Sequence, residues 1–130
     1  MSERPVDPVV EAVISHAAMP LLDKVQKELG RELVTDVVVF REGVRGPRIR
    51  IGSDDVSNEA DGELRLRIRE AHGTNRFVYS LESVYKRNVS DVGFSGFVAK
   101  GEVRLPEQGI PKVKPKSWTV RYNVWTFAQD

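Results

Sequence analysis

Apolar residues recur at steps of three or four between residues 8 and 29, and this spacing predicts one amphipathic helix. Asp7 is expected to cap its start, since a carboxylate can accept hydrogen bonds from the first free amides. Gly30 is expected to end it. Pro20 lacks an amide hydrogen, so we expect a kink or break near residues 17–19 and a bent helix. The apolar stripe consists of Val10, Val13, Ile14, Ala17, Leu21, Val25 and Leu29.

From Leu33 onward the hydrophobic period shortens to two and β-branched residues become frequent, which is typical of strands. Residues 106–116 contain three prolines and three lysines, so we expect an extended loop there. Gly43 and Gly46-Pro47 are expected to bound a turn before the second strand. The predicted strands cover about residues 33–42, 47–52, 63–71, 76–86, 93–105 and 117–128.

This order of elements predicts an α+β fold in one domain spanning residues 1–130: a bent N-terminal amphipathic helix packed on a curved antiparallel sheet of about six strands. No second helix is available to carry a parallel crossover, so an antiparallel meander is the simplest topology. A helix gripped by such a sheet would resemble cystatin-like or helix-grip architectures, by analogy of fold only. No sequence motif accompanies the analogy.

Composition narrows the classes of function. The 130 residues are 40% hydrophobic and 30% charged, as in ordinary globular domains. The absence of cysteine excludes disulfides, thiolate metal sites and cysteine nucleophiles. No apolar run is long enough to cross a membrane, so we expect a cytoplasmic protein with no membrane partner. A net charge of +1 gives no long-range attraction to nucleic acid from the total alone.

The clearest candidate site is a set of arginines that alternate with apolar residues on two predicted strands. Side chains two residues apart share one face of a strand, so these guanidinium groups should form rows on the solvent side. Opposed arginines repel, which implies interleaved carboxylates, an intervening strand or an anionic partner. The arginines are Arg48, Arg50, Arg65, Arg67 and Arg69, and Glu63, Glu70 and Glu82 are available as counterions.

Two interpretations of these arginines remain open. Guanidinium groups suit carboxylates and phosphates, which favours a docking surface for an acidic protein or for nucleic acid. Alternatively, they keep the exposed face of a sheet soluble. Lys112, Lys114 and Lys116 likewise either contact an acidic surface or phosphates, or form a solvated loop tip.

The sequence offers little for catalysis or metal binding. The acidic residues between Asp54 and Glu63 lack the spacing of a calcium loop, so we expect no metal and no cofactor. His16 and His72 form no recognised arrangement with a serine, and no catalytic residue is assigned. The aromatic residues of the last strands are expected to pack in the core rather than to stack on bases.

We therefore expect a non-catalytic protein-binding module, with an adaptor, inhibitor or immunity-like role, that docks an acidic protein through its arginine-rich sheet face. One alternative is a nucleic-acid-binding protein that uses the same arginines and the Lys112–Lys116 segment. A second alternative is a small-ligand pocket or enzyme between helix and sheet, lined by His16, Tyr79, Tyr122 or Trp125. Pairing of sheet edges in a homodimer is a further open alternative.

Overall fold

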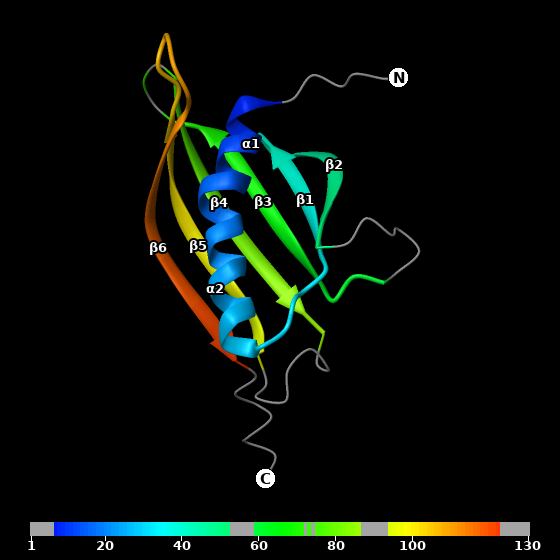
Figure 1. Cartoon of the computed structure of the whole chain (residues 1–130). Coiled ribbons are helices and arrows are strands. Elements are labelled where there is room, and N and C mark those ends of the chain that lie inside the picture. The colour runs from blue at the N-terminus through cyan, green and yellow to red at the C-terminus, as the bar shows by residue number, and fades with distance from the viewer. Residues whose placement is uncertain (1–6, 53–58, 72, 74, 87–93, 123–130) are drawn as a thin grey trace.

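The computed structural model describes residues 7–52, 59–71, 73, 75–86 and 94–122, apart from the side chains of Phe94 and Tyr122. It confirms the α+β class: one 22-residue N-terminal helix packs on a six-stranded, mostly antiparallel sheet that does not close into a barrel (Figure 1). His72, Trp125 and the predicted strand residues 93 and 123–128 lie outside the described residues.

The helix comprises α1 (Pro8–Val13), the π turn η1 (Ile14–Ala18) and α2 (Met19–Leu29). The strands are β1 (Thr35–Arg41), β2 (Val44–Ile51), β3 (Gly62–Glu70), β4 (Arg76–Tyr85), β5 (Phe94–Arg104) and β6 (Lys112–Tyr122).

Both ends of the helix follow from the sequence. The Asp7 carboxylate accepts hydrogen bonds from the amides of Val9 at 2.9 Å and Val10 at 3.4 Å, which confirms it as the N-cap. Gly30 adopts a left-handed conformation with φ of 74°, and its amide donates to the carbonyl of Gln26. A glycine adopts this conformation without a steric penalty, so the helix ends where the sequence predicts.

The irregularity expected near Pro20 is a π turn, and the helix is not broken. The amide of Met19 donates to the carbonyl of Ile14, five residues earlier, directly before the proline. Buried residues occur before, within and after this turn: Val13 precedes it, Ala17 and Ala18 lie in it, and Leu22 and Val25 follow it. The wider turn thus keeps one side of the helix facing the sheet on both sides of Pro20.

The strands lie in the order β2-β1-β3-β4-β5-β6, and β1 pairs with β3 in parallel. The expected simple meander is therefore correct from β3 to β6 and wrong at this pair. The reason lies in the register: Thr35, at the start of β1, pairs with Ile51 at the end of β2 and with Gly62 at the start of β3. Because the β1–β2 hairpin returns the chain to the start of β1, β3 can enter parallel to β1 without a crossover helix.

Two predicted strand starts and one predicted loop are wrong. The turn before β2 is formed by Glu42 and Gly43, with φ of 51° and 82°, so β2 begins at Val44 instead of 47 and contains Pro47. Strand β6 begins at Lys112 instead of 117 and contains Pro115, so most of the predicted lysine loop is strand. Both prolines lie in edge strands, where the missing amide need not break a ladder.

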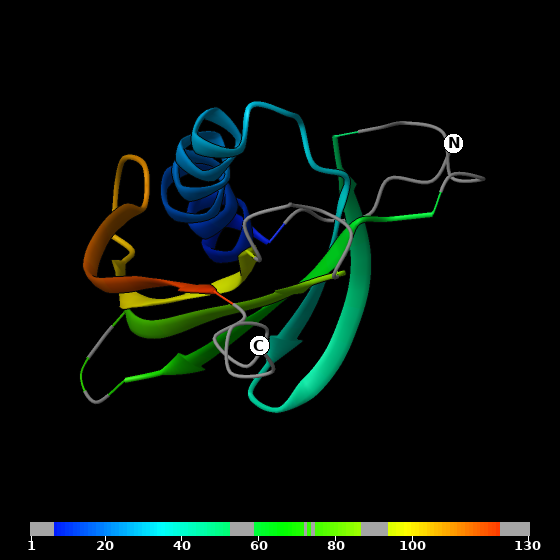
Figure 2. The ribbon, with the colours of Figure 1, turned by 90° about the horizontal axis from the view of Figure 1, so that it is seen from below.

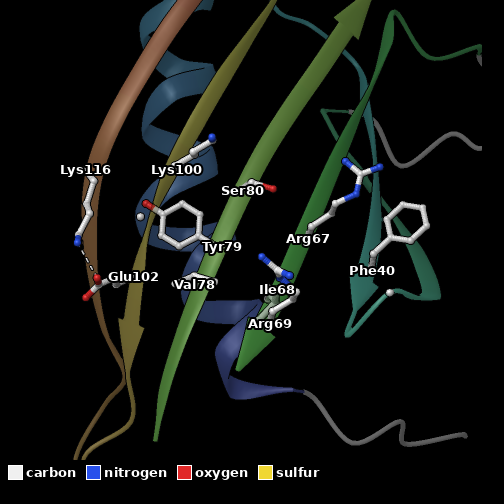
Figure 3. Close-up of a pocket in the computed structure, with 12 residues that line it drawn as sticks. Phe40, Arg67, Ile68, Arg69, Val78, Tyr79, Ser80, Lys100, Glu102 and Lys116 are labelled. Carbon is white, nitrogen blue, oxygen red and sulfur yellow. Dashed lines mark ion pairs between the residues drawn. The ribbon is translucent and has the colours of Figure 1, made fainter. Parts of the chain in front are cut away.

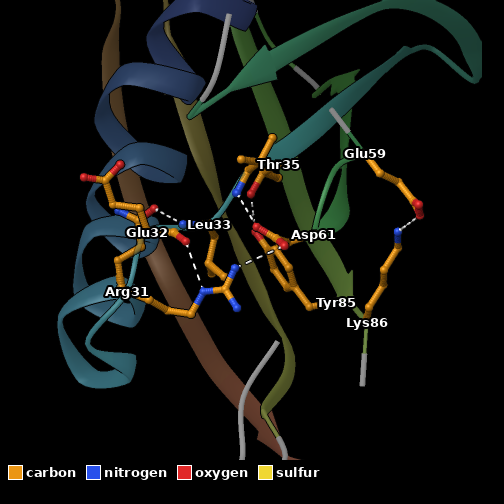
Figure 4. Close-up of polar contacts among 10 residues, drawn as sticks. Arg31, Glu32, Leu33, Thr35, Glu59, Asp61, Tyr85 and Lys86 are labelled. Atoms are coloured by element: carbon orange, nitrogen blue, oxygen red, sulfur yellow. Dashed lines mark hydrogen bonds and ion pairs between the residues drawn. The ribbon is translucent and has the colours of Figure 1, made fainter. Parts of the chain in front are cut away.

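One end of the sheet is held together around Asp61, just before β3 (Figure 4). Its carboxylate accepts a hydrogen bond from the Val34 amide at 2.8 Å and lies 3.2 Å from the guanidinium of Arg31. Its backbone carbonyl accepts from the Lys86 amide at 2.9 Å. Beneath it, the hydroxyls of Thr35 and Tyr85 are hydrogen-bonded at 2.6 Å in the core. This junction fixes the entry to β1 against β3 and the end of β4.

The core lies between the helix and one face of the twisted sheet (Figure 2). Two tyrosines on this inner face lie across glycines of the neighbouring strand: Tyr85 pairs with Gly62, and Tyr79 pairs with Gly101. A Cβ atom at either glycine would overlap the tyrosine ring. Glycine is required at both positions because the ring occupies the space of a side chain.

Candidate docking surface

The face of the sheet that points away from the helix is called the outer face here. Its residues alternate with the buried ones, so β3 places Leu64, Leu66 and Ile68 inward and the intervening residues outward. Cations dominate this face. They are Arg45, Arg48, Arg50, Arg65, Arg67, Arg69, Arg76, Lys100, Arg104, Lys112, Lys114, Lys116 and Arg121, whereas the described acids on it are Asp36, Glu63, Glu82 and Glu102.

All five predicted arginines lie on the outer face, but their two rows are not adjacent. Strand β1 separates β2 from β3, so Arg48 and Arg65 both flank Val38. Arg65, Arg67 and Arg69 are exposed. Arg50 is different, since only 17% of its side chain is accessible and its Nε lies 2.9 Å from the Asp36 carboxylate. Most of the arginine set is thus available to a partner, and Arg50 is engaged within the fold.

Carboxylates are interleaved among the arginines, which is one of the arrangements that the repulsion argument allows. Glu63 lies 3.1 Å from Arg65, and Glu82 lies 3.7 Å from Arg67 and 3.3 Å from Arg121. Glu70, the third expected counterion, takes part in none of the ion pairs of the described residues. Exposed pairs of this kind are worth little individually, so an incoming carboxylate can replace them at low cost.

The lysine series lies in edge strand β6 instead of a loop tip. Lys112 and Lys114 pair with Arg104 and Glu102 of β5, which places both side chains on the outer face. Lys116 falls at a register shift in β6, and its Nζ lies 2.6 Å from the Glu102 carboxylate. The structure thereby brings the lysines onto the same face as the arginines, although on the opposite edge of the sheet from β2.

A groove of about 710 Å³ crosses the centre of the outer face (Figure 3). Val78 and Ser80 of β4 lie on its floor. Arg67 and Arg69 project from β3 on one side, and Lys100 and Lys116 from β5 and β6 on the other. Within the described chain, Arg69 and Lys100 have no ion pair, so they are the groove cations best placed to bind an anion.

One aromatic ring and one buried valine lie beside arginines of the outer face. The guanidinium carbon of Arg67 lies 5.2 Å from the centroid of the Phe40 ring, a cation–π arrangement. Val38, between Arg48 and Arg65, is only 1% exposed although it points to the outer face. Arginine stems commonly cover apolar surface in this way while the charged groups stay in water.

Glu102 is the acidic centre of the lysine side of the groove. Its carboxylate contacts Lys116 and lies 3.3 Å from the guanidinium of Arg76. Hydrogen bonds from these two cations hold the pKa of Glu102 below its ordinary value, so it stays ionised at neutral pH. A second, smaller pocket continues past Glu102 between Arg76, Arg104, Lys112 and Lys114.

The other predicted candidates are dispersed. His16 is exposed on the helix, and Tyr79 is buried, with a pKa raised by desolvation. The Tyr122 side chain, His72 and Trp125 lie outside the described residues. Where the structure describes the chain, no group of acidic or histidine side chains could hold a metal ion, and no helix is long and apolar enough to span a membrane.

Sequence reasoning missed several outer-face cations, namely Arg45, Arg76, Lys100, Arg104 and Arg121. A signal for part of them was present, because Lys100, Glu102 and Arg104 alternate along one strand as the arginines of β3 do. Gly96 and Gly101 interrupt the pattern of the same strand, which makes this alternation less regular than that of β3. No family model, curated protein or solved structure matches the chain.

Proposed function

We propose that this protein is a binding module that docks an acidic segment of a partner protein on its outer face. The observation that carries the proposal is charge segregation. The chain as a whole has a net charge of +1, yet cations far outnumber acids on the outer face. Many of the compensating acids lie on the opposite side, such as Glu11, Asp23 and Glu28 on the helix. Such an arrangement steers and orients an anionic partner.

The groove supplies the anchor for this docking. Arg69 and Lys100 lie on its two sides without an ion pair to any described residue, and the Ser80 hydroxyl on the floor, in register with Lys100, can donate a hydrogen bond. A carboxylate placed here would replace water around two cations without first breaking a salt bridge. Binding to acidic side chains is therefore favoured at the groove over the β1–β2 side, where Asp36 already engages Arg50.

Nucleic acid is the second candidate, because the number of outer-face cations also suits a phosphate backbone. Base stacking has less support. Among the described aromatic side chains, Phe40 alone occupies an outer-face position, and Arg67 lies over its ring. We therefore rank an acidic protein segment first and nucleic acid second.

The test measures fluorescence anisotropy of a labelled peptide rich in glutamate and aspartate, together with a labelled DNA duplex as the competing probe. Arg69→Glu should weaken peptide binding roughly fivefold or more at low salt, since it removes one attraction and adds a repulsion. Lys27→Glu makes the same change in charge on the exposed side of α2 and is the matched control. Equal effects of the two variants would refute docking on the outer face. Preference for the duplex, with a steep salt dependence, would favour the second candidate.

A further inference from the structure

Three cations lie side by side across one end of the outer face, and they are called the cation row here. Arg76 at the start of β4 pairs with Arg104 at the end of β5, and Arg104 pairs with Lys112 at the start of β6. All three point outward, because the residue next to each of them along its strand packs against the core. Like charges are therefore opposed directly across two successive ladders, an arrangement that destabilises a sheet.

The opposition is closest between Arg76 and Arg104. The amide of Leu105 donates to the carbonyl of Asn75 at 2.8 Å, and this bond lies just outside the pair. In an antiparallel ladder, a bond at that position marks a pair that exchanges no hydrogen bonds of its own, and the Cα atoms of such a pair approach to about 4.5 Å. The two arginine side chains thus leave the sheet at the shortest spacing that a ladder offers.

The charge of the cation row is only partly compensated by the described residues. Glu102 lies 3.3 Å from Arg76, but it also contacts a lysine of β6, so one carboxylate is shared between two cations. Arg104 and Lys112 form no ion pair within the described chain, and neither does Lys114, the next outward residue of β6. An anion from outside would meet three cations that have no competing carboxylate.

The cation row, Glu102 and Lys114 line a pocket of about 250 Å³. Sites that enclose a drug-sized ligand begin at roughly 300 Å³, so this pocket suits one compact charged group. It adjoins the groove, since Glu102 lines both. An acidic segment that lies in the groove can therefore extend one side chain into this pocket.

We propose that the pocket binds a phosphate monoester carried by the acidic segment that docks on the outer face, so that one phosphorylated side chain of the partner lies over Arg104. This inference rests on the proposed function and names the modification that the site recognises. A phosphate monoester carries a charge of about −1.5 to −2 at pH 7 and presents three acceptor oxygens, so it can contact Arg104, Lys112 and Lys114 together. A carboxylate or a nucleic-acid phosphodiester carries a single charge and compensates less of the repulsion.

The experiment measures the anisotropy of three labelled peptides that differ at one position of a glutamate-rich sequence, which holds phosphoserine, glutamate or serine. The full chain should bind the phosphoserine peptide about tenfold more tightly than the glutamate peptide. In Arg104→Gln this preference should fall to about twofold or less. Arg48→Gln is the matched control and should keep the preference, because it removes the same group from the outer face on the opposite edge of the sheet.

Free phosphate is the other source of the same chemical group. Inorganic phosphate should displace the labelled phosphoserine peptide only at a concentration about a hundredfold or more above that of the unlabelled peptide, because it makes no contact in the groove. Equal potency of the two competitors would overturn the assignment to a partner segment and would indicate a site for free phosphate.

The variants separate this inference from the proposed function. Equal binding of the phosphoserine and glutamate peptides, or an unchanged preference in Arg104→Gln, would overturn the phosphate site. If Arg69→Glu still weakens binding of both peptides in that case, outer-face docking stands without it. If the preference depends on Arg104 while Arg69→Glu has no effect, the phosphate site stands and docking in the groove is refuted.

Discussion

The Glu102 carboxylate lies 2.6 Å from Nζ of Lys116 and forms an ion pair with it. Lys116 is one of the groove cations that a partner would contact. It also holds Arg76, at 3.3 Å. The outer face therefore contains an internal competitor for its own anionic ligand. Removing that competitor should improve binding rather than impair it.

Glu102→Gln is expected to tighten binding of the glutamate-rich peptide about two- to fivefold at low salt, because it releases Lys116 and Arg76 together. Anisotropy titration measures the change. Glu63→Gln is the matched control, since it makes the same charge change on the outer face but contacts Arg65 in β3, away from the groove. A larger gain from the Glu63 variant would contradict the role of Glu102.

Gly101→Ala is expected to destabilise the fold by about 1–3 kcal/mol. The added methyl group would overlap the Tyr79 ring and lie 2.6 Å from the backbone carbonyl oxygen of Lys114, which belongs to the next strand and cannot easily move. Urea unfolding measures the loss. Gly73→Ala is the comparison, because that glycine lies outside the strands and its nearest obstacle is the Arg76 side chain at 3.7 Å. Its positive φ will still cost something, so the prediction is the order of the two losses.

Alkaline pH is expected to destabilise the protein through Tyr85. Burial raises the pKa of this hydroxyl to about 12 from an ordinary 10.0, although its hydrogen bond with Thr35 acts in the opposite direction. Between these values the unfolded chain loses the proton while the folded chain keeps it. The free energy of unfolding should therefore fall as pH rises from about 10 to 12, by roughly 2–3 kcal/mol for this group.

Denaturant unfolding of the wild type and of Tyr85→Phe at several pH values isolates this contribution. The variant is less stable at neutral pH because it loses the bond to Thr35, but its stability should decline less steeply above pH 10. Parallel curves for the two proteins would show that Tyr85 does not titrate as described.

Asp7→Ala is expected to lower the free energy of unfolding by about 1 kcal/mol, because the amides of Val9 and Val10 lose their acceptor. Asp7 also forms an ion pair with Arg41 of β1, so the helix start is attached to the sheet as well. Thermal unfolding checks the effect. Asp23→Ala, exposed within α2, removes the same carboxylate without a cap and should cost less.

Local sequence signals predicted the helix, its cap at Asp7 and its end at Gly30 because each depends on neighbouring residues. The outward direction of Arg65, Arg67 and Arg69 was equally accessible, since strand alternation is local. These features needed no knowledge of which strands meet.

What the sequence could not predict depends on pairing between distant segments. Because prolines are rare in central strands, the sequence predicts a loop for the lysines, and only the strand order reveals that β6 is an edge where Pro115 is tolerated. The groove likewise exists because β3, β4 and β5 are neighbours, so Arg67 and Lys100 face each other across Ser80, and Arg69 lies next to Val78 on the same face. The net charge does not reveal the basic outer face, because a total over the chain says nothing about where the charged residues lie.

The parallel ladder between β1 and β3 has a consequence for how the protein assembles. Every other ladder joins strands that follow one another along the chain, so the β1–β2 pair and the β3–β6 group can each form from local encounters. Forming the ladder between β1 and β3 must close a loop that contains all of β2, so it loses more chain entropy than forming a hairpin does. Joining the two parts of the sheet therefore costs more chain entropy than closing any of its hairpins, so the strand order places the most non-local pairing at the centre of the fold.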